Sequence, residues 1–199
     1  MDLKTEIVRY TRMAFGIFEL ARTPAISDPV ASLRHNLENR DANFLDLVAR
    51  TIYPSPQNPY CRMLLNAQCE FPDLEREVRR EGLERTLKRL QEAGVYLTHD
   101  EFKGKAPIVR DGRLIEADAH SFDNPLISAK IEARSGGSRS AGTRTAHSVR
   151  TQLHWEQYQS VMAYELGIEH DPFVALLPIL PSVTGLTVSL RGRRYHWQV

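Results

Sequence analysis

The spacing of apolar residues changes near Gly94, and this change constrains the fold more than any other feature of the 199-residue chain. Before Gly94, apolar residues recur at the three- and four-residue intervals of amphipathic helices. After it, short apolar runs typical of strands follow. We therefore expect an α/β protein with a helical N-terminal region over 1–94, a mixed α/β sheet region over 95–190 and an atypical tail over 191–199.

Local signals place the expected helices. Asp28 can cap a helix that has Pro29 as its first residue, and Gly94 stands where a left-handed C-terminal cap is expected. Pro24 and Gly82 separate neighbouring periodic segments. The helices are expected over 4–20, 29–37, 45–52, 60–67, 72–80 and 83–93.

In the second half, the Asp111-Gly112 pair between two apolar runs predicts a β-hairpin over 107–115. Residues 95–98 are β-favouring, and 126–133 is expected to be a strand. Amphipathic spacing predicts a helix over 152–166, whose aromatic residues Trp155, Tyr158 and Tyr164 are expected in the core. Residues 173–180 read as a buried strand, and 183–190 as a strand or a helix.

Charge and composition exclude several classes of protein. Twenty-six Lys and Arg residues balance 25 Asp and Glu, which gives no reason to expect a nucleic acid or an anionic membrane as partner. No apolar stretch approaches the roughly 20 residues that cross a bilayer, and no secretory signal is seen. The cysteines, Cys61 and Cys69, are expected to be reduced, buried thiols of a cytoplasmic protein.

A segment rich in serine, glycine and threonine follows the expected strand at 126–133. Glycines let a backbone approach an anion closely, and hydroxyl and N–H groups donate hydrogen bonds to phosphate oxygens. A linker loop has the same composition, so that alternative stays open. A P-loop NTPase is disfavoured because no Lys follows Lys130. The predicted phosphate-binding residues are Ser135, Gly136, Gly137, Ser138, Gly142, Thr143, Arg144 and Thr145.

The order of strand, Ser/Gly/Thr loop, amphipathic helix and proline-containing apolar run resembles the early part of adenylate-forming enzymes. The resemblance is to the phenylacetate-CoA ligase and acyl-protein synthetase branch, whose S-G-T-T-G-x-P-T loop wraps the β- and γ-phosphates of ATP. Residues 135–138 match the opening of that loop, and 142–145 match its close. Arg139, Ser140 and Ala141 lengthen it, and Arg144 replaces the usual proline.

This resemblance implies an ATP- and Mg²⁺-dependent ligase that converts a small carboxylic acid to an acyl-adenylate and transfers the acyl group to a thiol such as coenzyme A. The family's adenine, ribose and magnesium residues and its catalytic lysine are not located in this sequence, so no catalytic residue is assigned. The chain is expected to be an N-terminal portion with an incomplete sheet domain, incomplete for catalysis and prone to self-association or to pairing with a complementary chain. The alternative is a non-catalytic α/β interaction module whose Ser/Gly loop is only a connector.

Other candidate sites have simpler explanations. The seven histidines lack H-x-x-x-H and H-E-x-x-H spacing, so no metal site is expected. Residues 120–123 and 169–171 contain Ser, His and Asp types, but adjacency in sequence does not make a triad. The basic and aromatic residues of 191–199 are expected in a solvated tail rather than in a nucleic-acid patch.

Overall fold

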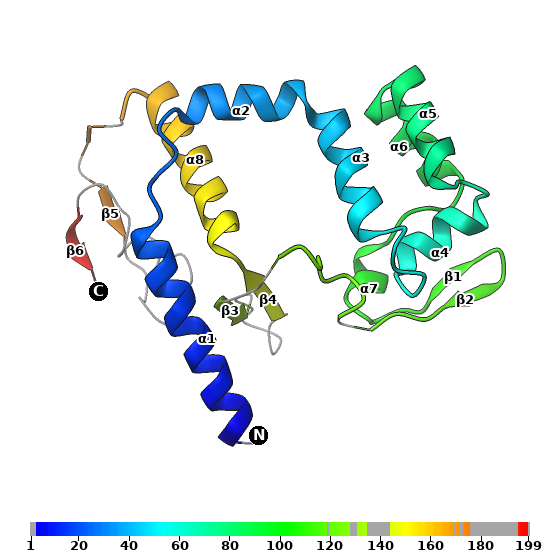
Figure 1. The fold of residues 1–199 in the computed structure, drawn as a ribbon, viewed down its shortest axis with the longest axis horizontal. Coiled ribbons are helices and arrows are strands. Elements are labelled where there is room, and N and C mark those ends of the chain that lie inside the picture. The colour runs from blue at the N-terminus through cyan, green and yellow to red at the C-terminus, as the bar shows by residue number, and fades with distance from the viewer. Residues whose placement is uncertain are drawn as a thin grey trace. The chain divides into compact units, whose positions relative to one another are not determined.

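The computed structural model describes residues 3–118, 120–127, 131–134, 144–168, 170–171, 173–175 and 195–198 (Figure 1). Their contacts form two compact units. One lies within residues 1–34 and 127–199, and the other within residues 35–126. The predicted boundary after Gly94 therefore falls inside the second unit.

Two helices form the frame of the first unit. Helix α1 (Leu3–Arg22) packs against α8 (Val149–Glu165) and against a strand, and its Leu20 is fully buried. Helix α2 (Pro29–Glu38) begins in this unit. The predicted cap is confirmed, because Asp28 Oδ1 accepts a hydrogen bond from the Ala31 amide at 2.8 Å.

Two small sheets complete the described part of the first unit. Strand β3 (Ile131–Arg134) pairs antiparallel with β4 (Arg144–His147), and β5 (Phe173–Ala175) pairs parallel with β6 (Tyr195–Gln198). The sequence predicted neither β4 nor β6, because the pairing of distant segments leaves no local signal. In particular, four residues of the expected solvated tail form β6 instead. Residues 176–190, which complete the last two elements predicted from the sequence, lie outside the described residues.

The second unit is mainly helical. Its helices are α3 (Arg40–Thr51), α4 (Pro59–Asn66), α5 (Phe71–Glu81), α6 (Leu83–Glu92) and the short α7 (His99–Phe102). Val48 of α3 packs with Leu74 and Val78 of α5 in one buried cluster. A second cluster joins Met63 of α4 to the hairpin described next. The predicted helices of this region are confirmed, and only α7 was not expected.

The predicted hairpin is also confirmed. Strand β1 (Ile108–Arg110) pairs antiparallel with β2 (Arg113–Ile115), and Asp111 and Gly112 take the positive φ values, 48° and 72°, of its two-residue turn. Residues 95–98, which are β-favouring in sequence, do not form a β-strand. Val95 and Leu97 instead pack against the buried cluster around Met63. Helices together with small sheets make the described chain a mixed α/β protein, as expected in broad outline.

Candidate functional site

The predicted phosphate-binding segment is flanked in the sequence by two strands of the first unit that pair with each other. In the β3–β4 register, Ile131 lies opposite His147 and Arg134 lies opposite Arg144. Nine residues, 135–143, connect the two paired ends, which is longer than the two to five residues of most hairpin loops. Arg144 and Thr145 therefore belong to β4. The other six predicted contacts, residues 135–138, 142 and 143, lie outside the described residues.

Helix α8 follows this hairpin almost directly. Strand β4 ends at His147, Ser148 is the N-cap, and its Oγ accepts a hydrogen bond from the Thr151 amide at 3.1 Å. Ser148 and Val149 are both buried. The hairpin and the first turn of the helix are thus joined without an intervening loop, and α1 packs on both β3 and α8.

Gln157 connects α8 to the start of α2. Its side chain is 1% exposed, and Nε2 donates to the Pro29 carbonyl at 2.9 Å. Its Oε1 has no hydrogen-bond partner among the described residues. This amide lies in the middle of α8, and its hydrogen bond to the Pro29 carbonyl joins α8 to the first turn of α2.

The aromatic residues of α8 do not occupy the core, so that prediction is wrong. Trp155, Tyr158 and Tyr164 are 59%, 50% and 62% exposed. The helix has apolar residues on more than one side, and periodicity alone does not say which side is buried. Together with Met162 and Leu166, two of these aromatics form an exposed stripe at helical spacing, Trp155, Tyr158, Met162 and Leu166.

In the second unit, the most buried charged pair is Arg110 with Glu101. Nη1 of Arg110 donates to Glu101 Oε1 at 2.7 Å, and Nε donates to the Gly94 carbonyl at 2.9 Å. The guanidinium also donates to the Tyr96 carbonyl and lies 4.1 Å from the centre of the Tyr96 ring. Arg110 lowers the pKa of Glu101 to about 2, so this carboxylate is a poor base and the pair is structural. The Thr98-x-x-Glu101 capping box is a local sequence signal for the start of α7.

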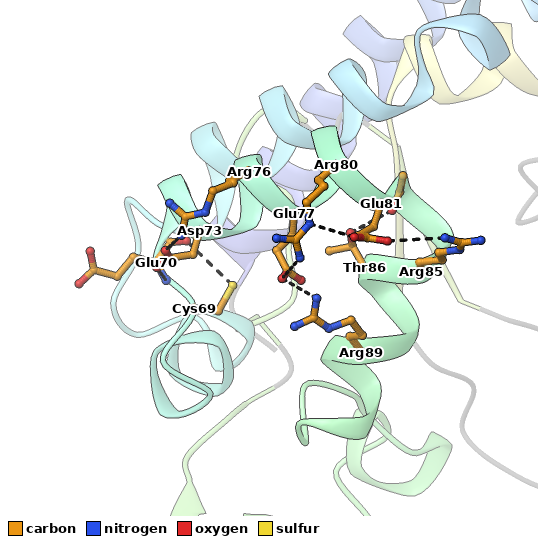
Figure 2. A network of polar contacts seen from close by, with 11 residues as sticks. Cys69, Glu70, Asp73, Arg76, Glu77, Arg80, Glu81, Arg85, Thr86 and Arg89 are labelled. Atoms are coloured by element: carbon orange, nitrogen blue, oxygen red, sulfur yellow. Dashed lines mark hydrogen bonds and ion pairs between the residues drawn. The ribbon is translucent and has the colours of Figure 1, made fainter.

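Helices α5 and α6 are linked by a network of arginines and carboxylates (Figure 2). Glu77 bridges Arg80 of its own helix and Arg89 of α6, with N···O distances of 3.5 and 2.6 Å. Glu81 contacts Arg80 and Arg85, and Arg80 lowers the pKa of Glu81. Because each arginine of this network has a carboxylate neighbour, the network does not define an anion site.

Cys69 lies at the edge of that network. Its Sγ is 4.0 Å from the Glu70 carbonyl oxygen, and its own carbonyl accepts a hydrogen bond from the Tyr53 hydroxyl at 2.9 Å. Burial raises the pKa of the thiols of both Cys69 and Cys61. A raised pKa disfavours the nucleophilic thiolate, so neither cysteine is a catalytic candidate. Both are free thiols, as expected, but only Cys61 is buried and Cys69 is partly exposed.

An open groove of about 610 Å³ lies between α3 and α5. Leu45, Phe71 and Val78 supply apolar lining. The acidic groups Asp46 and Glu75 also line it, but each is paired with an arginine of its own helix. The groove thus has apolar surface without a set of convergent polar groups that would select a ligand.

The His120 segment does not form a triad. The Ser121 hydroxyl donates to Asp118 Oδ1 at 2.9 Å, whereas His120 Nδ1 lies 3.1 Å from Asp123 Oδ2. Serine and histidine thus have different carboxylate partners and belong to a polar turn. Within the described ranges, no group of three His, Cys, Asp or Glu residues could hold a metal ion.

Comparisons with known proteins do not place the chain in a family. No family model, no curated protein and no solved structure matches it. None of the helices in the described part combines the length and the apolar character needed to cross a membrane.

Proposed function

We propose that this chain binds the phosphates of ATP at residues 135–145 and contributes this contact to a carboxylate-activating reaction. In that reaction a carboxylate oxygen attacks the α-phosphorus, acyl-adenylate forms and pyrophosphate leaves. A thiol such as that of coenzyme A then takes the acyl group and AMP leaves. The donors of the segment would stabilise the charge of the leaving pyrophosphate.

One observation carries the proposal: the antiparallel pairing of β3 with β4. This pairing holds the two ends of the Ser/Gly/Thr-rich segment next to each other on a sheet. Fixed ends favour a ligand-binding loop over a linker, because a linker connects parts that lie apart. The N-terminus of α8 follows β4 after a single residue, and helix N-termini favour anions. The described residues offer no carboxylate cluster for Mg²⁺, so we assign no residue to the metal.

Nucleotide-dependent protection tests the proposal. With ATP and Mg²⁺ we expect a higher thermal midpoint and slower proteolysis within residues 135–145. Replacing Ser135 and Thr143 by Ala should reduce both effects, whereas Ser55→Ala, at an exposed serine of the other unit, should leave them unchanged. If ATP changes neither property of the wild-type chain, the proposal fails.

Carboxylate-dependent exchange of labelled pyrophosphate into ATP tests the chemical step. A set of aliphatic and aromatic acids is used because the acid is not identified. Protection by ATP without exchange would leave phosphate binding as the function of this chain and would remove acid activation from the proposal.

A second candidate is a non-catalytic interaction module. It is favoured by the exposed stripe of α8 and by exposed apolar residues of α1, where Ile7, Phe15 and Phe18 are 56%, 66% and 58% exposed. Contiguous exposed apolar residues are typical of interfaces. Sedimentation of the wild-type chain and of Trp155→Lys with Met162→Lys tests this candidate. Association that is lost in the variant supports it, and a monomeric wild type contradicts self-association.

A further inference from the structure

We propose that the exposed stripe of α8 is an interface between two copies of this chain, which meet through their α8 helices in antiparallel orientation. The inference rests on the second candidate given under the proposed function and deepens it, because it names the partner and the orientation. Phosphate binding at residues 135–145 is not required for it.

Helix α8 buries polar side chains and exposes apolar ones. Gln152 and Gln157 are 4% and 1% exposed, whereas Met162 and Leu166 are 62% and 65% exposed. Helix α1 packs against α8 within the same unit, but the stripe stays open to solvent among the described residues. Single exposed apolar residues are common on protein surfaces, whereas contiguous ones mark interaction sites. The stripe is therefore the side of α8 that a partner would stabilise most.

The order of residues in the stripe favours antiparallel contact between two copies. Trp155 and Tyr158 lie toward its N-terminal end, and Met162 and Leu166 lie toward its C-terminal end. Antiparallel helices that meet near Ser160 place Trp155 of one copy beside Leu166 of the other, and Tyr158 close to Met162. The same two contacts recur on both sides of the two-fold axis, as an isologous interface requires. A thioether also packs favourably against an aromatic ring.

The charged residues of α8 agree with this partner and this orientation. Glu165 is exposed near one end of the helix, and His154 is partly exposed near the other. Antiparallel contact brings Glu165 of one copy near His154 of the second, whereas parallel contact would bring the two Glu165 carboxylates together. Arg150 and Glu156 lie off the stripe at helical spacing. The helix thus lacks the basic face of helices that bind anionic membranes, which favours a second copy over a lipid surface.

The size of the stripe predicts a weak dimer. Large side chains of this kind have about 200 Å² of surface each, and the exposed half leaves about 100 Å² per residue. The four residues then offer about 400 Å² per copy, half of the roughly 800 Å² that each partner buries in a standard interface. Small interfaces are typical of transient complexes, so we expect a dissociation constant in the micromolar range.

Sedimentation equilibrium of the full chain at increasing concentration tests the interface. We expect the wild type to dimerise and Met162→Glu to weaken dimerisation by about tenfold or more, because the substitution buries a charge without a partner. The matched control is Leu114→Glu, since Leu114 is 63% exposed and belongs to the other unit. It should change the dissociation constant less than about twofold, as surface substitutions away from an interface do.

Disulfide cross-linking tests the orientation. Chains that carry Trp155→Cys or Leu166→Cys are oxidised separately and as a mixture, and the wild-type chain measures the background from its own two cysteines. Antiparallel contact predicts cross-links mainly between the two different variants, because the opposite ends of the stripe lie together. Cross-links mainly between identical variants show parallel contact and refute the proposed orientation.

The outcomes separate this inference from the proposed functions. A wild-type chain that is monomeric at about 100 μM, well above a micromolar dissociation constant, refutes the dimer. Binding of that monomer to phosphatidylcholine vesicles also refutes it and assigns the stripe to a lipid surface. A dimer that Met162→Glu weakens no more than Leu114→Glu does refutes the α8 interface but keeps the interaction module. Protection by ATP is measured separately and decides only the phosphate-binding proposal.

Discussion

The Arg110 guanidinium and the Glu101 carboxylate form an ion pair whose side chains are only 10% and 9% exposed. The same guanidinium donates to the carbonyls of Gly94 and Tyr96. One side chain of β1 therefore holds the end of α6 and the start of α7 in place. Because the Glu101 carboxylate also accepts a hydrogen bond from the Thr98 amide, the ion pair is part of a helix cap as well.

Removal of Arg110 should destabilise the second unit strongly. Arg110→Met leaves the Glu101 carboxylate buried without its counter-ion, and we expect a loss of about 3 kcal/mol in the free energy of unfolding. Hydrogen exchange of peptides within residues 94–115 at increasing urea measures it. The control is Arg85→Met, since Arg85 is 79% exposed and its pair with Glu81 should contribute less than about 1 kcal/mol. Equal losses for the two variants would contradict a special role of the buried pair.

The same pair predicts a dependence of stability on pH. The pKa of Glu101 falls from 4.5 to about 2 on folding, so the folded state favours the ionised carboxylate. This stabilisation is fully present above about pH 4.5 and is lost as the pH falls toward about 2. In Glu101→Gln, residue 101 does not ionise, so its contribution to the unfolding free energy should not change with pH. The difference in unfolding free energy between wild type and variant, measured from pH 7 down to pH 2, should shrink only in the acidic part, and a constant difference would contradict the assignment.

Gly94 should tolerate asparagine better than alanine. Its φ of +86° is rarely adopted by residues with a side chain, whereas an added Cβ would meet only Arg110 Cδ at 3.5 Å, an ordinary contact. Gly94→Ala should therefore cost about 1 kcal/mol in unfolding free energy through backbone strain. Gly94→Asn should cost less, because asparagine enters the left-handed region more readily. If urea unfolding shows asparagine to be the more costly replacement, side-chain crowding rather than φ limits the position.

The two cysteines should differ in their reaction with iodoacetamide. Cys61 is 2% exposed and Cys69 is half-buried, and burial raises the pKa of both thiols. At pH 8 we expect Cys61 to be alkylated more slowly than Cys69, and both more slowly than in urea. Peptide mass spectrometry after timed labelling measures the two rates. Native labelling of Cys61 at its unfolded rate would show that α4 opens readily.

Most helices and one hairpin were predictable because their signals are local. The Asp28-Pro29 start, the glycine after α6 and the Asp111-Gly112 turn each act within a few residues. For the candidate site, the sequence supplied the phosphate-binding residues as a hypothesis. Six of these eight residues lie outside the described part of the chain, and the role of all eight stays a prediction.

The buried side of each element was less predictable. Helix α8 formed where its spacing indicated, but Trp155 and Tyr158 are exposed. An apolar stripe predicts that a helix has a face to bury, whereas the available neighbours decide whether that face is covered. The burial of Arg110 could not be predicted either, because nothing near it in the sequence distinguishes it from an exposed arginine such as Arg113.

Capping residues, proline geometry and positive φ indicated most helices and the β1–β2 turn, because these signals are properties of neighbouring residues, but helix α3 begins at Arg40 and not at the predicted residue 45. The pairing of β3 with β4, the pairing of β5 with β6 and the joining of residues from both ends of the chain in one unit depend on tertiary contacts. These contacts join segments separated by nine or more residues. Their free energy depends on which surfaces meet after the chain has closed its loops, and no short window of sequence contains that information.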